Sequence, residues 1–284
     1  MCITFLYTRD VDSSSNYKLI LINNRDEFYA RKTLKAKVKI DEGLIQIFGT
    51  DVEGLIHGTW LAISKKNGVI KIGNLLNLPG EKVLRKKTEL QGRGPIALDF
   101  IRGTDAIEVH NKKLCDVSTN YNSFNFLSVE ITTEYIKTLF TNNATQSYVE
   151  LKPGVAGVSN SPISTPLKKV VAGEKKFHEI IQDYEAKNKD LFIDQLMNLL
   201  KWSQKHYPDD ELLRRRGKEA EFFSSIHVSG HDLYGSRTRT IILVDKFDNI
   251  DYIEETITNF DDPDNPIWER TRFLIEDDSV IQCS

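Results

Sequence analysis

The chain has 284 residues, 40% of them hydrophobic, and its formal net charge is −3. At roughly 150 residues per domain, this length gives one large domain or two small ones with enough apolar side chains for a core, which excludes general disorder. The acidic balance excludes a nucleic-acid coat, because such a coat needs clustered positive charge. Three cysteines, the first of them Cys2, are too few for a secreted disulfide scaffold and odd in number, so we expect a reducing compartment.

The N-terminus shows no targeting pattern. Its apolar run is short, no basic segment precedes it, and Asp10 and Asp12 argue against a transit peptide. The longest apolar stretches, Leu19–Ile22 and Ile241–Val244, are the size of strands, whereas a membrane span needs ~20 apolar residues. We therefore expect a cytoplasmic protein with at most peripheral membrane contact.

Short runs of β-branched and aromatic residues, bounded by Asn, Asp and Gly, recur along the chain and predict strands. These runs are Cys2–Thr8, Tyr17–Asn23, Leu44–Gly49, Thr59–Ser64, Val69–Leu76, Phe124–Ile131, Tyr135–Thr141, Thr238–Asp245 and Ile250–Thr256. Helical spacing of apolar residues predicts a short helix after Pro95, at Ile96–Ile101, and longer ones after Pro166, at Leu167–Ile181, and at Leu191–Leu200.

Strands, then helices, then strands again predict an α+β architecture whose layers share one core. The segment nearest to a linker is Lys187–Asp190, which is too short to separate two domains. We therefore expect a single domain over residues 1–284.

The start of the chain places Cys2 beside a charged tetrapeptide. The first two predicted strands are joined by the short polar stretch Arg9–Asn16, so they should pair antiparallel. A loop centred there puts Cys2 opposite Asn23 or Asn24, with an error of a residue or two. The tetrapeptide Asn24-Arg25-Asp26-Glu27 would then end the second strand beside the start of the first.

This placement suggests chemistry at Cys2. If Met1 is removed, Cys2 carries a thiol and an α-amine, with reference pKa values of ~8.5 and ~7.7–8, so one residue supplies both nucleophile and base. A nearby Arg25 would favour the thiolate, and Asp26 could orient the amine or the arginine. The alternative is a cysteine that merely packs at a strand start, followed by a polar turn.

Two later segments could contribute to the same site. Asn160, in the tight turn Gly157–Pro162, could donate an amide hydrogen to an oxyanion, or belong to an ordinary loop before the next helix. Alternation along a strand puts Arg237 and Arg239 on one face, where both could meet an anionic ligand; the alternative is a polar strand end.

A metal site is not expected. The six histidines are dispersed, and only His227 and His231 stand four apart, in a context that spoils a helical reading. A single histidine could ligate haem, but no spacing demands it. We expect no metal and no required cofactor.

These segments together resemble the NRDE family, whose eukaryotic branch is the transport and Golgi organisation protein 2 group. The resemblance runs from residue 1 to about residue 270 and is strongest at Cys2 and Asn24–Glu27. It is supported by segments that occur in the same order: Gly58–Ile63, Leu75–Leu78, Arg93-Gly94, Ser159–Ser161 and Tyr234–Thr238.

The resemblance implies a fold similar to N-terminal-nucleophile hydrolases, an α+β four-layer αββα sandwich with two antiparallel sheets. By that similarity the catalytic set would be Cys2 as nucleophile, its neighbours Arg25 and Asp26, Asn160 as oxyanion donor and Arg237 as the late arginine. The ligand-binding set would be Asn24, Arg25, Asp26, Glu27 and Arg237.

For function, the resemblance implies haem trafficking or the handling of acyl lipids, linked to lipid homeostasis, Golgi organisation and secretion. The candidate ligands are haem, as transported cargo, or an acyl-coenzyme A, with organelle-membrane proteins as candidate partners at mitochondria or the Golgi. The alternative is a cysteine amidase or thioesterase acting on acyl conjugates. A third interpretation treats Asn24–Glu27 as a purely structural device.

Overall fold

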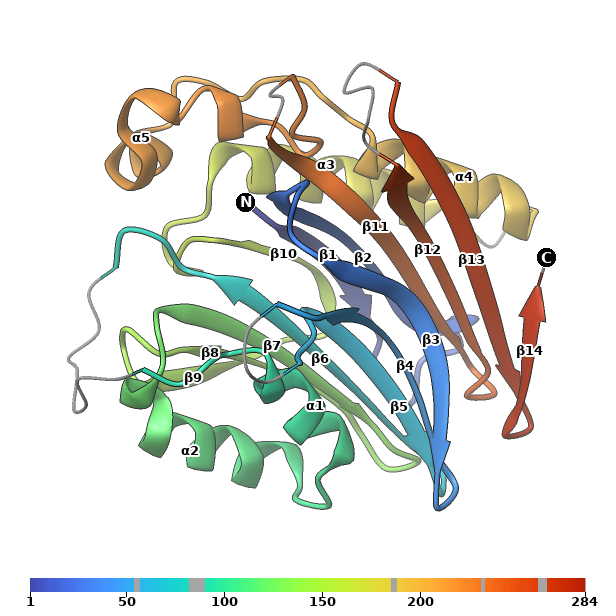
Figure 1. The fold of residues 1–284 in the computed structure, drawn as a ribbon. Helices are drawn as coiled ribbons and strands as arrows, with labels where there is room; N and C mark the ends of the chain where they lie inside the picture. The colour runs from blue at the N-terminus through green and yellow to red at the C-terminus, as the bar shows by residue number, and fades with distance from the viewer. Residues whose placement is uncertain (54–56, 82–89, 185–187, 231–232, 260–264, 284) are drawn as a thin grey trace. The chain divides into compact units, whose positions relative to one another are not determined.

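The computed structural model describes residues 1–284 except 54–56, 82–89, 185–187, 231–232, 260–264 and 284 (Figure 1). The described residues form two seven-stranded sheets in which all neighbouring strands run antiparallel, together with α-helices. The fold is thus α+β with two antiparallel sheets, which confirms the expected fold class.

The first sheet has the strand order β10-β1-β2-β11-β12-β13-β14. Its strands are β1 Ile3–Thr8, β2 Tyr17–Phe28, β10 Gly154–Ser159, β11 Tyr234–Asp245, β12 Ile250–Asn259, β13 Ile267–Glu276 and β14 Ser279–Cys283. Helices α3 (Lys168–Gln182) and α4 (Lys189–Leu200) pack on one face, which we call the helix-side face, and the short helix α5 spans Asp210–Arg216.

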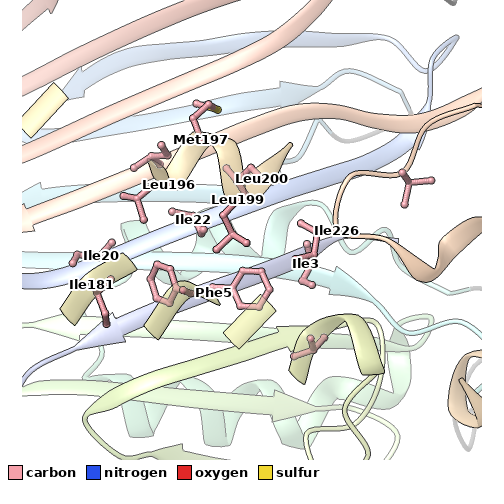
Figure 2. Close-up of a cluster of buried hydrophobic side chains, with 14 of the residues drawn as sticks. Ile3, Phe5, Ile20, Ile22, Ile181, Leu196, Met197, Leu199, Leu200 and Ile226 are labelled. Atoms are coloured by element: carbon pink, nitrogen blue, oxygen red, sulfur yellow. The ribbon is translucent and has the colours of Figure 1, made fainter. Parts of the chain in front are cut away.

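The core between this sheet and its helices follows from the alternation of side chains along each strand (Figure 2). Ile3 and Phe5 of β1, with Ile20 and Ile22 of β2, point to the same face and are all fully buried. A side chain at Gly173 of α3 would meet the Phe5 ring at 2.2 Å, so only glycine lets the helix approach this closely.

The second sheet has the sequential order β3-β4-β5-β6-β7-β8-β9. Its strands are β3 Thr33–Asp41, β4 Leu44–Asp51, β5 Leu61–Lys66, β6 Val69–Asn77, β7 Phe124–Ile131, β8 Ile136–Asn142 and β9 Ser147–Leu151. Helices α1 (Pro95–Arg102) and α2 (Ile107–Val117) pack on one of its faces, with Phe100 edge-on to Phe126.

The chain divides into two compact units. One contains residues 1–9, 14–31 and 153–284, and therefore the first sheet; the other contains residues 10–13 and 32–152, and therefore the second. The expectation of one domain over residues 1–284 stays a prediction. Of the expected linker, Lys187 lies outside the described residues, and α4 begins at Lys189.

Several elements differ from the sequence prediction. The second strand does not end at Asn23 but continues to Phe28, because the backbone of the tetrapeptide pairs with β11. Strands β3, β9, β10, β13 and β14 and helix α2 were not predicted. Strand β3 is an edge strand with Lys35, Lys37 and Lys39 in alternation, a charged pattern that protects an edge but hides a strand from apolar periodicity. No described helix is both long and apolar enough to span a membrane.

Candidate functional site

The candidate site lies where the chain enters β1. The registers pair Ile3 with Ser159 of β10 and with Asn24 of β2. Continued by one residue, they place Cys2 between Asn160 on one side and Arg25 on the other. The predicted hairpin placement is confirmed within its stated error of a residue or two, although the tetrapeptide lies inside β2 rather than after it.

The pleat of the sheet separates the site residues onto two faces. Met1 and Ile3 belong to the core on the helix-side face, and Asn24 and Asp26 share the parity of Ile22 on the neighbouring strand. Cys2 alternates with them, so it falls on the opposite face. Arg25 and Asn160 share that opposite face. We call Asn160, Cys2 and Arg25 the cysteine row.

On the helix-side face, the side chains of four residues surround Met1. This helix-side cluster consists of Met1, Asp26, Lys169, Tyr234 and Ser236. The Met1 amino group lies 3.0 Å from Asp26 Oδ2, with neither side exposed, and donates to the Tyr234 hydroxyl at 2.7 Å. Ser236 donates its hydroxyl hydrogen to Asp26 Oδ1. Both carboxylate oxygens of Asp26 are therefore engaged.

Lys169 of α3 completes the cluster and was missed by the sequence analysis. Its side chain is fully buried, and Nζ donates to the main-chain oxygens of Met1 at 3.3 Å and Ser225 at 3.0 Å. A signal was present, because Lys169 stands four residues before Gly173 and eight before Phe177, on the stripe of α3 that is buried. A lysine on the apolar stripe of a helix indicates that its ammonium group has a polar partner inside the fold.

Burial dominates the electrostatics of the site. It lowers the pKa of the Met1 amino group, against an opposing effect of Asp26, and it lowers the pKa of Lys169. Burial also raises the pKa of the Cys2 thiol, although the N-terminal amine and Arg25 act in the opposite direction. The thiol is therefore protonated at neutral pH in the chain that carries Met1.

The cysteine row is held mainly through its backbone. Ser159 donates its hydroxyl hydrogen to the main-chain oxygen of Cys2 at 2.7 Å, and the Cys2 thiol faces the main-chain oxygen of Asp26 at 3.8 Å. Arg25 and Asn160 are both buried, whereas Cys2 is half-buried. Arg25 lies 3.9 Å from the carboxylate of Glu27. The structure thus brings three predicted site residues to one face of the sheet.

Arg237 directly precedes Thr238 of β11, the residue that pairs with Arg25. Arg237 Nη1 donates to the main-chain oxygens of Phe28, Tyr29 and Arg31 at 2.9, 3.1 and 2.6 Å, so the guanidinium holds the turn that follows β2. The register shift between Ser236 and Thr238 interrupts the strand alternation on which the shared face with Arg239 was predicted, and that shared face stays a prediction.

Arg239 and Asn24 have contacts elsewhere on the helix-side face. Arg239 pairs with Glu255 at 3.2 Å. Asn24 Nδ2 donates to the main-chain oxygens of Leu200 and Ile226, at 2.8 and 3.0 Å, and so ties β2 to the end of α4. These contacts anchor the backbone, and the ligand-binding role expected of Asn24 and Glu27 stays a prediction.

Beside the helix-side cluster, aromatic rings and cations lie in contact. We call this set the aromatic-basic cluster: Phe28, Lys205, Arg216, Phe222, Phe223 and Tyr234. The Tyr234 ring lies 5.1 Å from Phe28 and 5.5 Å from Phe223, edge-on to both. Lys205 Nζ lies 5.4 Å from the Phe222 ring, and the Arg216 guanidinium lies 4.4 Å from the Phe223 ring. Phe28 is 55% exposed and Leu233, before Tyr234, is 61% exposed.

No group of three or more His, Cys, Asp or Glu side chains suited to a metal ion occurs among the residues that the structure describes. His231 lies outside them, so its expected spacing from His227 has no structural counterpart.

The fold and the site together define a class: an α+β protein with two antiparallel sheets and a cysteine placed at the start of a central strand pair. A family model described as "Transport and Golgi organisation 2" matches residues 1–259. The chain belongs to this family.

Its similarity to relatives named for transport and Golgi organisation covers nearly the whole chain. It is 36% identical over 270 residues to "Transport and Golgi organization protein 2" of Drosophila melanogaster, covering 92% of this chain and 94% of that one. It is 30% identical over 282 residues to "Transport and Golgi organization 2 homolog" of Mus musculus, covering 96% and 98%.

Among solved structures, the chain is similar to penicillin V acylase from Agrobacterium tumefaciens, with a TM-score of 0.44, 10% identity, and coverage of 96% of this chain and 91% of that one. At this distance the similarity carries no argument about activity.

Proposed function

We propose that this protein handles an amphipathic anion, haem or an acyl-coenzyme A, in the transport and Golgi organisation after which its relatives are named. The observation that carries the proposal is the aromatic-basic cluster, where exposed apolar surface and cations meet. Aromatic rings suit a porphyrin or an acyl chain, and the cations suit its carboxylates or phosphates.

Tyr234 and Arg237, from the segment Tyr234–Thr238 that resembles the family, support the position of the aromatic-basic cluster. Tyr234 belongs to both clusters, since its ring contacts Phe28 and its hydroxyl donates to the main-chain oxygen of Asp26 at 3.1 Å. Arg237 holds the turn that follows Phe28. A ligand held by this surface is partly exposed, which fits transfer between partners at organelle membranes, those of the Golgi or mitochondria, with the protein itself cytoplasmic.

Titration of the purified chain with haem and with palmitoyl-coenzyme A, followed by absorbance and by tryptophan fluorescence, tests this function. We expect saturable binding of at least one ligand, weakened at least 5-fold by Lys205→Glu. The matched control is Lys246→Glu, because Lys246 also lies over a ring, Phe247 at 5.2 Å, beyond the opposite end of β11. Absence of saturable binding of both ligands, or equal weakening by the two variants, would contradict the proposal.

A second candidate function is hydrolysis of an acyl amide or thioester, favoured by the cysteine row. The Cys2 sulfur would attack the acyl carbon, the C–N or C–S bond would break, and the amine or thiol would leave with the thiol proton. Water would then hydrolyse the acyl-cysteine. Asn160 would donate to the oxyanion, and Arg25 would favour the thiolate.

This hydrolase requires Cys2 at the true N-terminus, because the amine that serves as base must be its own. In the structure the buried amino group belongs to Met1. Intact mass of the protein purified from cells is the decisive measurement, and retention of Met1 excludes the self-base mechanism. If Met1 is absent, we expect Cys2→Ala to abolish turnover of acyl substrates; unchanged turnover would refute the role.

A further inference from the structure

We propose that a cavity where β2 begins and β11 ends binds a small planar aromatic carboxylate. The cavity, which we call the ring pocket, has a volume of about 280 Å³ and lies at the opposite end of β11 from Tyr234. Its residues come from the start of β2, the segment after α3, the start of α4 and the turn after β11, all in the unit that contains the first sheet. The ring pocket is separate from the aromatic-basic cluster, so this inference goes beyond the proposed function.

Three aromatic rings form one wall of the ring pocket. The Tyr17 ring lies 5.3 Å from the Tyr184 ring and 5.9 Å from the Phe192 ring, and the last two lie 5.6 Å apart. The planes of Tyr17 and Phe192 are within 25° of parallel. Rings that already pack on one another form a fixed apolar surface, and a planar ligand ring gains the same kind of contact by packing against it.

Phe247 lines the same pocket and is 72% exposed. The turn that carries it is fixed by hydrogen bonds: Asp245 Oδ1 accepts from the main-chain nitrogens of Phe247 and Asn249 at 2.8 and 2.9 Å, and the Lys246 nitrogen donates to the main-chain oxygen of Asn16 at 2.8 Å. A ligand ring packed against Phe247 removes apolar surface from water on both partners, which stabilises the complex.

The charge that the ring pocket offers to a ligand is positive. The Asp245 carboxylate is engaged by its own turn, and Lys189 pairs with Asp251 at 2.8 Å. Lys246 Nζ lies 5.2 Å from the centre of the Phe247 ring and pairs with no carboxylate among the residues that the structure describes. An ammonium group beside an accessible ring suits a carboxylate attached to an aromatic ring, because the two parts of the ligand meet the two side chains together.

The rest of the pocket restricts the ligand in size and charge. The cavity lies just below the usual range for ligand pockets, roughly 300–1,000 Å³, so one or two fused rings fit and a porphyrin does not. Burial, with added effects of Asp251 and Asp245, raises the pKa of Tyr17 to about 12. The Tyr17 hydroxyl therefore keeps its proton and adds no negative charge that would repel a carboxylate.

The probe is naphthalene-2-carboxylate, titrated into the full chain by calorimetry and followed by thermal unfolding. We expect saturable binding of one probe per chain with a Kd below about 1 mM, and a rise in Tm with probe concentration. Naphthalene-2-carboxamide keeps the rings without the charge, and cyclohexanecarboxylate keeps the charge without an aromatic ring. Each should bind at least 5-fold more weakly. Absence of saturable binding of naphthalene-2-carboxylate, or equal binding of either analogue, overturns the proposal.

Two variants locate the binding. Lys246→Glu and Phe247→Ala should each weaken binding of naphthalene-2-carboxylate at least 5-fold. Both side chains are exposed, so the variants should fold, which their Tm without probe checks. The matched controls are Lys205→Glu, at a cation beside another ring, and Tyr148→Ala, at an exposed ring of the second sheet. Equal weakening by the controls and the pocket variants overturns the proposal.

The same two lysine variants separate this inference from the proposed function. Lys205→Glu should weaken binding of haem or palmitoyl-coenzyme A and spare naphthalene-2-carboxylate, whereas Lys246→Glu should do the reverse. Loss of the first pattern with the second retained contradicts only the proposed function, and loss of the second with the first retained contradicts only the ring pocket.

Discussion

The helix-side cluster and the cysteine row lie back to back on the same strands, yet they differ in almost every physical respect. Around Met1, buried side chains from three elements, β2, β11 and α3, contact the residue or one another. Residue Cys2 is half-buried, its thiol faces the main-chain oxygen of Asp26, and its carbonyl oxygen accepts from Ser159. The helix-side cluster is built for stability and fit, whereas the cysteine row retains a reactive group.

Adjacent residues therefore belong to different clusters, because the pleat of a strand points their side chains to opposite faces of the sheet. Met1 and Cys2 are neighbours in the chain, as are Arg25 and Asp26, yet each pair is divided between the two faces. The Asp26 carboxylate therefore pairs with the Met1 amine on one face, while Arg25 lies beside Cys2 on the other. Four predictions test this division, from the largest expected effect to the smallest.

Asp26→Asn should lower the free energy of unfolding by about 3–5 kcal/mol, because it leaves a buried ammonium group without its counter-ion. Urea denaturation measures the change. Asp105→Asn is the control, since Asp105 pairs with Lys113 at 2.7 Å on the surface, where solvent screens the pair, and it should cost far less than Asp26→Asn. Equal losses of unfolding free energy in the two variants would show that the buried ion pair of Asp26 contributes no more to stability than a surface ion pair. Loss of haem or acyl-coenzyme A binding at unchanged Tm would exclude the purely structural interpretation of Asn24–Glu27.

His227 should make the free energy of unfolding of the protein depend on pH. Burial lowers its pKa from 6.5 to about 4, with a further lowering by Arg239. The unfolded chain takes up the proton below pH 6.5 while the folded chain does not, so stability falls between pH 6.5 and about 4 and levels off below that.

The expected loss from His227 is about 2–3 kcal/mol. His227→Gln should remove it when unfolding is measured by urea at a series of pH values, while His178→Gln, at an exposed position, should not. An unchanged pH profile for His227→Gln would contradict the prediction.

Tyr234→Phe should cost about 1–2 kcal/mol, because the Met1 amine loses a hydrogen-bond acceptor and the main-chain oxygen of Asp26 loses a donor. Thermal and urea unfolding measure the cost. The matched change Tyr148→Phe, on an exposed strand, should be within about 0.5 kcal/mol of the parent chain. A Tyr234→Phe variant as stable as this control would contradict the expected contribution of the Tyr234 hydroxyl to the stability of the helix-side cluster.

Cys2→Ala should change stability least, by less than about 1 kcal/mol, because the thiol makes a long contact, at 3.8 Å, with the main-chain oxygen of Asp26 and alanine removes a single atom. The thiol should nevertheless report its environment. Since burial raises its pKa, alkylation by iodoacetamide should rise with pH at higher values than for a free cysteine peptide. Alkylation that is already maximal at pH 7 would show that the cysteine row activates the thiol in the Met1 chain.

Much of the fold could be anticipated from local pattern. The apolar runs predicted the central strands, and Pro95 with the apolar residues after it predicted α1, because those elements are buried and their periodicity is strong. Lysine-bearing β3 and the exposed β9 carry no such apolar run, since edge strands keep polar side chains on accessible surfaces. Turn length alone placed Cys2 beside Asn24–Glu27.

Local sequence patterns could not predict contacts between residues that are far apart in the chain. Lys169 lies far along the chain from Met1, and no spacing rule links a helical lysine to a main-chain carbonyl at the start of the chain. The register shift beside Arg237 is likewise a property of the pairing of β11 with β2, and sequence alternation did not predict the contact of that guanidinium with the turn after Phe28. Residue types and their local period follow from the chain itself. Which of them meet depends on how strands pair and helices pack, because contact energies act across space rather than along the sequence.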